Sequence, residues 1–268
     1  MTFTGTIGWL CMYPLRAIIS FCVRFRIHPN VLTLVGVIIN AGAGLALGLG
    51  EFRLAGFVMI VANIFDFIDG KVAEETALSS NFGGFWDSVM DRFSDMFLFL
   101  GLIYLYAQLS RPDYVLITAL ALMFSVMTSY TRARAESLIE KCKVGFMERP
   151  ERIVLFMIGA FTNRMGAVMW IVLILSIITV IDRIYFTWRE LQLQQTKHED
   201  QNIHMTFKRA LALPIIAVWH ALFWTFDRAT WQYDLMVIAI LTFVWVTPPS
   251  WLGDPTAQGP GLIGFLFR

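Results

Sequence analysis

Residues 63–95 read NIFDFIDGKVAEETALSSNFGGFWDSVMDRFSD and join the second apolar segment of the chain to the third. Asp66 and Asp69 close the second segment, and Asp87 and Asp91 open the third. Spacings of three and four residues place each pair on one face of a helix. Because a single loop joins the two helix ends, we expect the four carboxylates to converge at one depth.

The composition predicts a membrane protein. Of the 268 residues, 57% are hydrophobic and only 15% are charged, and the mean hydropathy is +0.64. A soluble domain carries more charge. Most of the apolar segments approach the ~20 residues that a helix needs to cross a bilayer, and only helices satisfy their backbone there. We therefore predict an all-α polytopic membrane protein with a six-helix transmembrane bundle. The six apolar segments cover roughly 31–49, 54–70, 86–107, 114–131, 152–163 and 166–182.

Two further regions flank the predicted core of residues 31–185. The N-terminal region, residues 1–30, mixes apolar side chains with arginines and has no cleavage site, so we expect an interfacial helix over 7–26 rather than a signal peptide. The short fifth segment is expected to begin further back, in Glu148–Arg152.

Residues 186–268 are predicted to form a polar linker followed by an apolar extension. The linker, residues 189–209, is expected to be a solvated loop or a surface helix. Apolar stretches at 210–226 and 234–247 follow, and they fit two more spans, a re-entrant pair or an element of a homodimer. The tail, residues 248–264, is rich in proline and glycine and is expected to be irregular.

The charge distribution predicts orientation and excludes some partners. Lys and Arg concentrate before Pro29, at Lys71 and in the loops after the fourth and sixth segments, which places the N-terminus and the aspartate loop on the cytoplasmic side. A net charge of +1 gives no indication of a nucleic-acid partner. Three scattered cysteines, Cys11, Cys22 and Cys142, are too few for a disulfide framework.

Four carboxylates at one membrane depth favour a metal site. Charged side chains are costly in a membrane, and like charges repel one another. Mg²⁺ or Mn²⁺ binds oxygen ligands and bridges phosphates, and two ions could clamp a diphosphate. The absence of nearby His or Cys in the sequence disfavours zinc. The alternative is that the aspartates are only helix caps and surface residues.

The aspartates and the small residues between them form one pattern, Asp66-x-x-Asp69-Gly70-x-x-Ala73 followed by Gly83-x-x-x-Asp87-x-x-x-Asp91. This pattern resembles the signature of the CDP-alcohol phosphotransferase family. The resemblance extends over roughly residues 27–182 and includes the segment Pro29-Asn30-Val31-Leu32-Thr33 before the first span.

The resemblance implies six helices around a polar cavity that opens to the cytoplasm. It implies that Asp66, Asp69 and Asp87 hold the metal ions, and that Asp91 helps to hold them and acts as general base. The CDP moiety would approach the backbone closely at three small residues, Gly70, Ala73 and Gly83.

One position departs from the family, which generally has arginine after the alanine where this chain has Glu74, followed by Glu75. Either Lys71 supplies a compensating charge, or Glu74 points away into water.

Two arginine-rich segments indicate a second site, for a phosphorylated acceptor. Residues 129–134 read SYTRAR and residues 148–152 read ERPER. Arginine binds phosphate with two parallel hydrogen bonds. The segments resemble the phosphatidylinositol-phosphate synthase branch of the family. Four arginines would bind the acceptor phosphate, with Arg149 the least clearly placed: Arg132, Arg134, Arg152 and Arg149. The alternative is that they are interface anchors, paired with acidic neighbours: Glu136, Glu148 and Glu151.

The resemblance implies transfer of the phosphatidyl group from CDP-diacylglycerol to a polyol phosphate, with inositol phosphate favoured and CMP released. Glycerol 3-phosphate fits the same charge pattern, as in a phosphatidylglycerophosphate synthase. Two other functions remain open at this point, a divalent-cation transporter and a catalytically degenerate scaffold.

Overall fold

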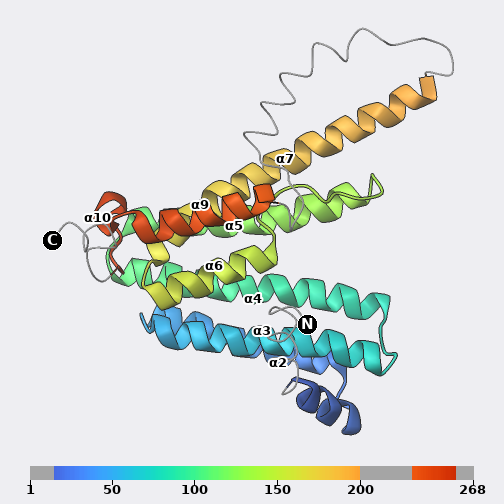
Figure 1. Ribbon diagram of the computed structural model, residues 1–268, viewed down its shortest axis with the longest axis horizontal. Helices are drawn as coiled ribbons and strands as arrows, with labels where there is room; N and C mark the ends of the chain where they lie inside the picture. The colour runs from blue at the N-terminus through green and yellow to red at the C-terminus, as the bar shows by residue number, and fades with distance from the viewer. Residues whose placement is uncertain (1–14, 200–230, 258–268) are drawn as a thin grey trace. The chain divides into compact units, whose positions relative to one another are not determined.

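The computed structural model describes residues 15–199 and 231–257, and these residues form helices and loops without a strand (Figure 1). The helices group into two compact units, Met1–Gln108 (unit 1) and Leu109–Arg268 (unit 2). Each predicted apolar segment before residue 183 lies in its own helix. The fold class is therefore all-α, as the composition predicts.

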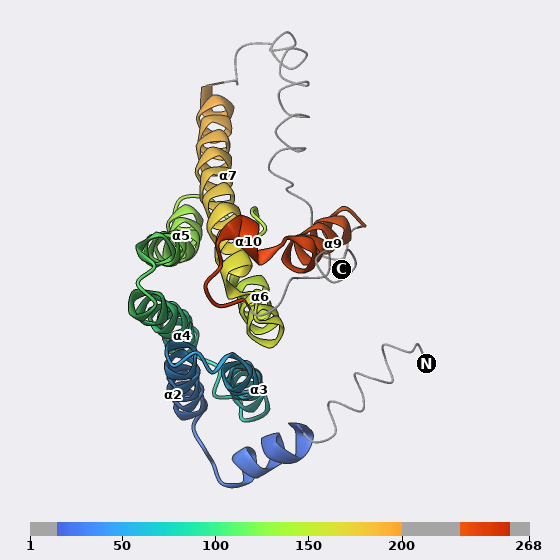
Figure 2. The same cartoon turned by 90° about the vertical axis from the view of Figure 1, so that its left-hand side faces the viewer.

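Unit 1 contains a first helix over residues 15–24 and then α2 (Pro29–Gly48), α3 (Phe52–Glu75) and α4 (Asn81–Gln108). α2 begins at a proline, which loses no hydrogen bond in the first turn of a helix. It packs along both α3 and α4 (Figures 1 and 2).

Glycines allow α2 and α4 to approach closely. A Cβ atom on Gly44 would lie 2.3 Å from the backbone oxygen of Phe97, and one on Gly101 would lie 1.9 Å from the backbone oxygen of Gly44. No side chain fits there, so the two backbones are in contact, as small residues permit in membrane helices. Gly42 has open space instead and contributes no such contact.

One side of the first helix packs against α2 and α3. Ile19 and Cys22 are buried in a cluster that includes Ile68 of α3, whereas Phe21 on the opposite side is exposed. The predicted interfacial helix over 7–26 is therefore amphipathic where it is described; its residues before Leu15 lie outside the described part of the chain.

Unit 2 is built around a long helix, α7, against which α5, α6, α9 and α10 pack. The helices are α5 (Pro112–Glu136), α6 (Arg149–Thr162), α7 (Met165–Glu199), α9 (Trp231–Val246) and α10 (Pro249–Leu252). α6 begins where the sequence predicted, within the ERPER segment. It ends at Thr162 and is followed by the C-cap residue Asn163, which has a left-handed conformation with φ of 53°.

The region after residue 185 differs in part from the expectation. α7 continues as helix to Glu199, which agrees with the surface-helix alternative for the start of the predicted linker. The apolar stretch 210–226 lies outside the described residues, and the stretch 234–247 forms most of α9. The tail, expected to be irregular, begins with one helical turn, Pro249–Leu252, because a proline is tolerated at the first helical position.

The residues after α9 form hydrogen bonds with the first turns of α5 and α7. The Tyr114 hydroxyl donates a hydrogen bond to the backbone oxygen of Leu252 at 2.8 Å. The Gly166 amide, in the first turn of α7, donates to a carboxylate oxygen of Asp254 at 2.9 Å. Since early helix amides have no partner within the helix, Asp254 caps α7 from a distance in sequence.

Among the described residues, three helices are long and apolar enough to cross a membrane: Pro29–Gly48, Pro112–Glu136 and Met165–Gln194. α3 and α4 carry the four aspartates, and α6 has only 14 residues. The apolar helices indicate an integral membrane protein, and the count of six spans stays a prediction.

Candidate active site

A pocket of about 370 Å³ opens in unit 1 where the start of α2, the end of α3, the following loop and the start of α4 meet. The chain turns there because α3 ends at Glu75 and Ala77 has a left-handed conformation, with φ of 54°. The lining residues are Pro29, Asn30, Thr33, Asp66, Asp69, Gly70, Ala73, Leu78, Ser79, Ser80, Gly83, Gly84 and Asp87. Most of the candidate residues of the aspartate motif thus line one pocket.

Three of the four aspartates form a compact group. Asp66, Asp87 and Asp91 each offer a carboxylate oxygen, these oxygens all lie within 4.8 Å of one another, and the three residues are half-buried. Asp66 comes from α3 and the other two from α4, so the group depends on both helices. An all-oxygen donor set of this kind fits a hard divalent cation such as Mg²⁺ or Mn²⁺.

The fourth aspartate, Asp69, is held in a different way. It is only 6% exposed, and one of its carboxylate oxygens accepts a hydrogen bond from the Thr33 hydroxyl of α2 at 2.5 Å. A hydrogen bond to an ionised carboxylate is stronger than a hydrogen bond between two neutral groups. In the sequence, Thr33 stood out only as part of the segment before the first span. The local pattern did not predict its hydrogen bond to Asp69.

The small residues of the motif leave space at the pocket wall. A Cβ atom added to Gly70 or Gly84 would meet no atom within 4 Å. The Gly83 amide donates a hydrogen bond to the Ser80 hydroxyl oxygen at 3.0 Å, which caps the first turn of α4. The backbone is therefore open to a ligand at Gly70 and Gly84, whereas at Gly83 it is fixed by the cap.

Glu74, which replaces the family's arginine, pairs with Lys71. The Lys71 Nζ atom lies 2.7 Å from a carboxylate oxygen of Glu74, and the Glu74 side chain is 70% exposed. This hydrogen bond and the ammonium charge hold the pKa of Glu74 below its usual value. Neither residue lines the pocket. The structure therefore agrees with the second alternative, in which Glu74 points into water. Lys71 neutralises Glu74 but, outside the pocket lining, it does not take the place of the family's arginine.

The arginine-rich segments form a charged network in unit 2. One carboxylate oxygen of Glu148 accepts hydrogen bonds from Arg132 at 2.7 Å and from Arg183 at 3.1 Å. Arg132 also reaches Glu136 at 3.2 Å. Arg183, only 2% exposed, donates further to the backbone oxygens of Val144 and Thr128.

The other predicted acceptor arginines have different surroundings. Arg134 is exposed and donates to the Ser137 hydroxyl oxygen at 3.2 Å. Arg149 opens α6 and is half-buried, and Arg152, one turn later, is only 2% exposed. Burial to this extent is rare for an interface anchor, whose charged end normally reaches water.

Arg183 is the residue of this network that sequence reasoning missed. It was noted only as a positive charge after the sixth segment. The one available signal was its position at the end of an apolar segment, immediately after Asp182. Its partners lie up to 55 residues away in sequence, so a local pattern could not reveal them.

Comparisons with known proteins show similarity over most of the predicted core. The family model described as CDP-alcohol phosphatidyltransferase matches residues 26–182. The archaetidylinositol phosphate synthase of Pyrococcus horikoshii is 36% identical over 181 residues, which covers 67% of this chain and 94% of that protein.

Two solved structures of the phosphatidylinositol phosphate synthase of Mycobacterium tuberculosis are also similar. The structure with CDP-DAG bound has a TM-score of 0.62 and 28% identity, and it covers 65% of this chain and 93% of that one. The structure in complex with manganese and citrate has a TM-score of 0.61 and 29% identity, with 65% and 88% covered.

Proposed function

The chain belongs to the CDP-alcohol phosphatidyltransferase family, and from this membership we propose that it transfers the phosphatidyl group of CDP-diacylglycerol to a polyol phosphate, with inositol phosphate favoured. It is an integral membrane enzyme of phospholipid biosynthesis, and the released product is CMP. The observation that carries the proposal is the pocket of unit 1, which brings the aspartates and small residues of the motif together.

Divalent cations, Mg²⁺ or Mn²⁺ and two in number, would be held by the four aspartates of the motif: Asp66, Asp69, Asp87 and Asp91. The closeness of three carboxylate oxygens supports this assignment, as does the manganese complex of the mycobacterial relative. When bound, the cations would neutralise the diphosphate and the developing negative charge.

The residues of the pocket then bind and orient the nucleotide lipid. Gly70 and Gly84 leave open space at the wall, so a diphosphate or a sugar can approach the backbone. Ala73 and Gly83 line the same pocket. The bond from Thr33 fixes the orientation of Asp69, so this carboxylate needs little rearrangement when the substrate arrives.

Asp91 is proposed as the general base. Its carboxylate takes the proton from the acceptor hydroxyl as that oxygen attacks the phosphorus attached to diacylglycerol. The bond between this phosphorus and the oxygen of CMP breaks, and CMP leaves with the electron pair. Asp91 is not among the residues that line the pocket, and the support for this role is the closeness of its carboxylate to those of Asp66 and Asp87.

The acceptor phosphate would bind the arginines of unit 2. Arg132 and Arg183 both contact one oxygen of Glu148, which holds two guanidinium groups close together against their mutual repulsion. Arg132 also pairs with Glu136, so the charges of Arg132 and Arg183 are balanced by two carboxylates, and an arriving phosphate would compete with these carboxylates for the guanidinium groups. The paired N–H donors of arginine favour a phosphorylated alcohol over a neutral one. Arg134, Arg149 and Arg152 are further candidates for the same phosphate. Glycerol 3-phosphate fits the same charges, so it is the alternative acceptor.

The membrane arrangement is part of the proposal. Six helices, α2 to α7, would span the bilayer, with the active site facing the cytoplasm, where Lys and Arg concentrate. The amphipathic first helix would lie in the interface. Family membership disfavours a cation transporter. The outward pairing of Glu74 keeps its negative charge away from the pocket, which disfavours a degenerate scaffold.

An acceptor screen tests the function. The purified chain is supplied with CDP-diacylglycerol and Mg²⁺ or Mn²⁺, and CMP release is measured with inositol phosphate, glycerol 3-phosphate, inositol and glycerol. We expect the highest turnover with inositol phosphate and little with the two unphosphorylated alcohols. Equal turnover with inositol and inositol phosphate would contradict the polyol-phosphate assignment, and no CMP release with any acceptor would contradict the enzyme assignment.

A further inference from the structure

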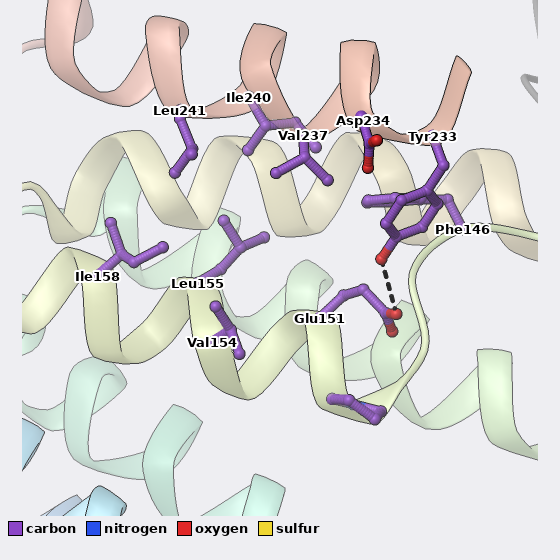
Figure 3. Close-up of a pocket in the computed structure, with 11 residues that line it drawn as sticks. Phe146, Glu151, Val154, Leu155, Ile158, Tyr233, Asp234, Val237, Ile240 and Leu241 are labelled. Atoms are coloured by element: carbon purple, nitrogen blue, oxygen red, sulfur yellow. Dashed lines mark hydrogen bonds between the residues drawn. The ribbon is translucent and has the colours of Figure 1, made fainter. Parts of the chain in front are cut away.

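A second pocket, of about 350 Å³, lies in unit 2 between α6 and α9 (Figure 3). Its size falls within the range of small-molecule sites. α9 lies beyond residue 182, where the family match ends, so one wall of this pocket is outside the matched region. The site is therefore not accounted for by the reaction proposed above.

The long walls of the pocket are aliphatic. Val154, Leu155 and Ile158 of α6 face Val237, Ile240 and Leu241 of α9. These positions cover little more than one turn of each helix. With Glu151 and Tyr233 at one end, the lining extends along about two turns of each helix, on the order of 10 Å at about 1.5 Å per residue. A narrow apolar space of this length between two helices suits an alkyl chain.

One end of the pocket is polar and acidic. The Tyr233 hydroxyl donates a hydrogen bond to a carboxylate oxygen of Glu151 at 3.1 Å, and Asp234 lies beside it (Figure 3). The ring of Phe146 lies 5.2 Å from that of Tyr233 and closes this end. Among the described lining residues, the charged ones are Glu151 and Asp234, and none is basic.

We propose that this pocket binds a membrane amphiphile that has an alkyl chain and a protonated amine head group. The chain would lie between the aliphatic walls, where burial removes it from water. The ammonium group would reach Glu151 and Asp234 and form charge-assisted hydrogen bonds with their carboxylates. A head group with a negative charge would be repelled by the same two carboxylates, so the charge of the lining selects the amine.

The test is photolabelling of the full chain in phosphatidylcholine nanodiscs. The probes are dodecylamine, dodecanol and dodecanoic acid, each carrying a diazirine on the chain, and labelled peptides are identified by mass spectrometry. We expect dodecylamine to label α6 and α9 preferentially within residues 146–158 and 233–241. Dodecanol should label them several-fold less, and dodecanoic acid least. Equal labelling by the three probes, or labelling without preference for these helices, overturns the proposal.

Matched variants locate the site. Ile240→Trp fills the pocket and should reduce labelling by dodecylamine about tenfold. Ile238→Trp, two residues away on the exposed side of α9, should leave it unchanged. If both variants reduce labelling equally, the probe binds the outer surface of α9 and the proposal fails. A thermal unfolding scan shows whether Ile240→Trp is folded, and the labelling map of the unaltered chain decides the matter if it is not.

The head-group preference is tested separately. The double variant Glu151→Gln, Asp234→Asn keeps the shape of the pocket but removes both charges, so dodecylamine and dodecanol should then label equally. A preference for the amine that persists in this variant contradicts the assigned role of the carboxylates. All of these measurements report binding and not CMP release, so their failure leaves the proposed phosphotransfer intact.

Discussion

The aspartate pocket of unit 1 and the arginine network of unit 2 both bring charged side chains together, but they are built differently. Asp66, Asp87 and Asp91 bring three negative charges together at the edge of an open pocket. In unit 2, by contrast, Arg132 and Arg183 already share a carboxylate of the protein itself, Glu148. Under the proposed function, the first cluster would need an added cation to bind a diphosphate, whereas the second would receive a phosphate without one.

Removal of the metal should have the largest effect on activity, and it tests whether the aspartate pocket depends on a cation. We expect excess EDTA to abolish CMP release completely, and Mg²⁺ or Mn²⁺ to restore it, because the carboxylates would otherwise repel the diphosphate. Zinc should restore little, since the donor set is all oxygen. Full turnover in excess EDTA would show that the aspartates act without a metal.

The next largest effect distinguishes the roles within the aspartate pocket. Asp91→Asn removes the proposed general base, and we expect turnover to fall about 10²- to 10⁴-fold while binding of CDP-diacylglycerol weakens far less. Single-turnover CMP release and equilibrium binding of the lipid measure the two quantities. Glu74→Gln is the control, because this exposed carboxylate lies outside the pocket lining and should leave both quantities unchanged. Near-normal turnover in Asp91→Asn would mean that another residue is the base.

A smaller effect should follow from the residue that supports Asp69. Thr33→Val keeps the shape of the side chain but removes the hydroxyl that donates to Asp69. Partners of metal ligands typically contribute about 10- to 100-fold to metal affinity, so activation by Mn²⁺ should require a concentration at least about tenfold higher. Titration of CMP release with Mn²⁺ measures this. A Thr33→Ser variant should restore the affinity, and an unchanged titration in Thr33→Val would assign the bond a purely structural role.

On the arginine side, Arg132→Ala should raise the KM for the acceptor about tenfold, because a charge-assisted hydrogen bond contributes roughly 1.5–3 kcal/mol. The KM for CDP-diacylglycerol should change little. Lys141→Ala removes an exposed cation from the loop after α5 and should change neither value. If Arg132→Ala weakens both substrates equally, the arginine supports the fold instead of the acceptor.

The smallest effect concerns the packing that positions the aspartate pocket. Gly44→Ala places a Cβ atom against the backbone of Phe97, so α2 and α4 must separate, at a cost of about 1–3 kcal/mol in the free energy of unfolding. Gly42→Ala, on the same helix with open space around it, should be neutral. Thermal unfolding midpoints of the two variants measure the difference, and equal midpoints would show that the close approach is not needed for stability.

Much of the fold could be predicted because the signals are local. Apolar segments predicted α2 to α7, and the shortness of the fifth segment predicted that α6 begins further back, within Glu148–Arg152. The continuation of α7 to Glu199 was left open between helix and loop, since polar residues in a solvated helix give the same composition as a linker. The hydrogen bond from the Gly166 amide to Asp254 could not be predicted from a local pattern, because the two residues are 88 positions apart in the sequence.

The sequence by itself determined the aspartate site, because its residues lie within one short stretch. Spacings of three and four along a helix fix a common face, and a short loop leaves α3 and α4 little freedom in how their ends meet. The tertiary structure decided which charges are paired. It joined Thr33 to Asp69, turned Glu74 outward to Lys71, and placed Arg183 beside Glu148. Except for the pairing of Glu74 with Lys71 within one helical turn, these contacts depend on the packing of helices distant in sequence, which no local spacing specifies.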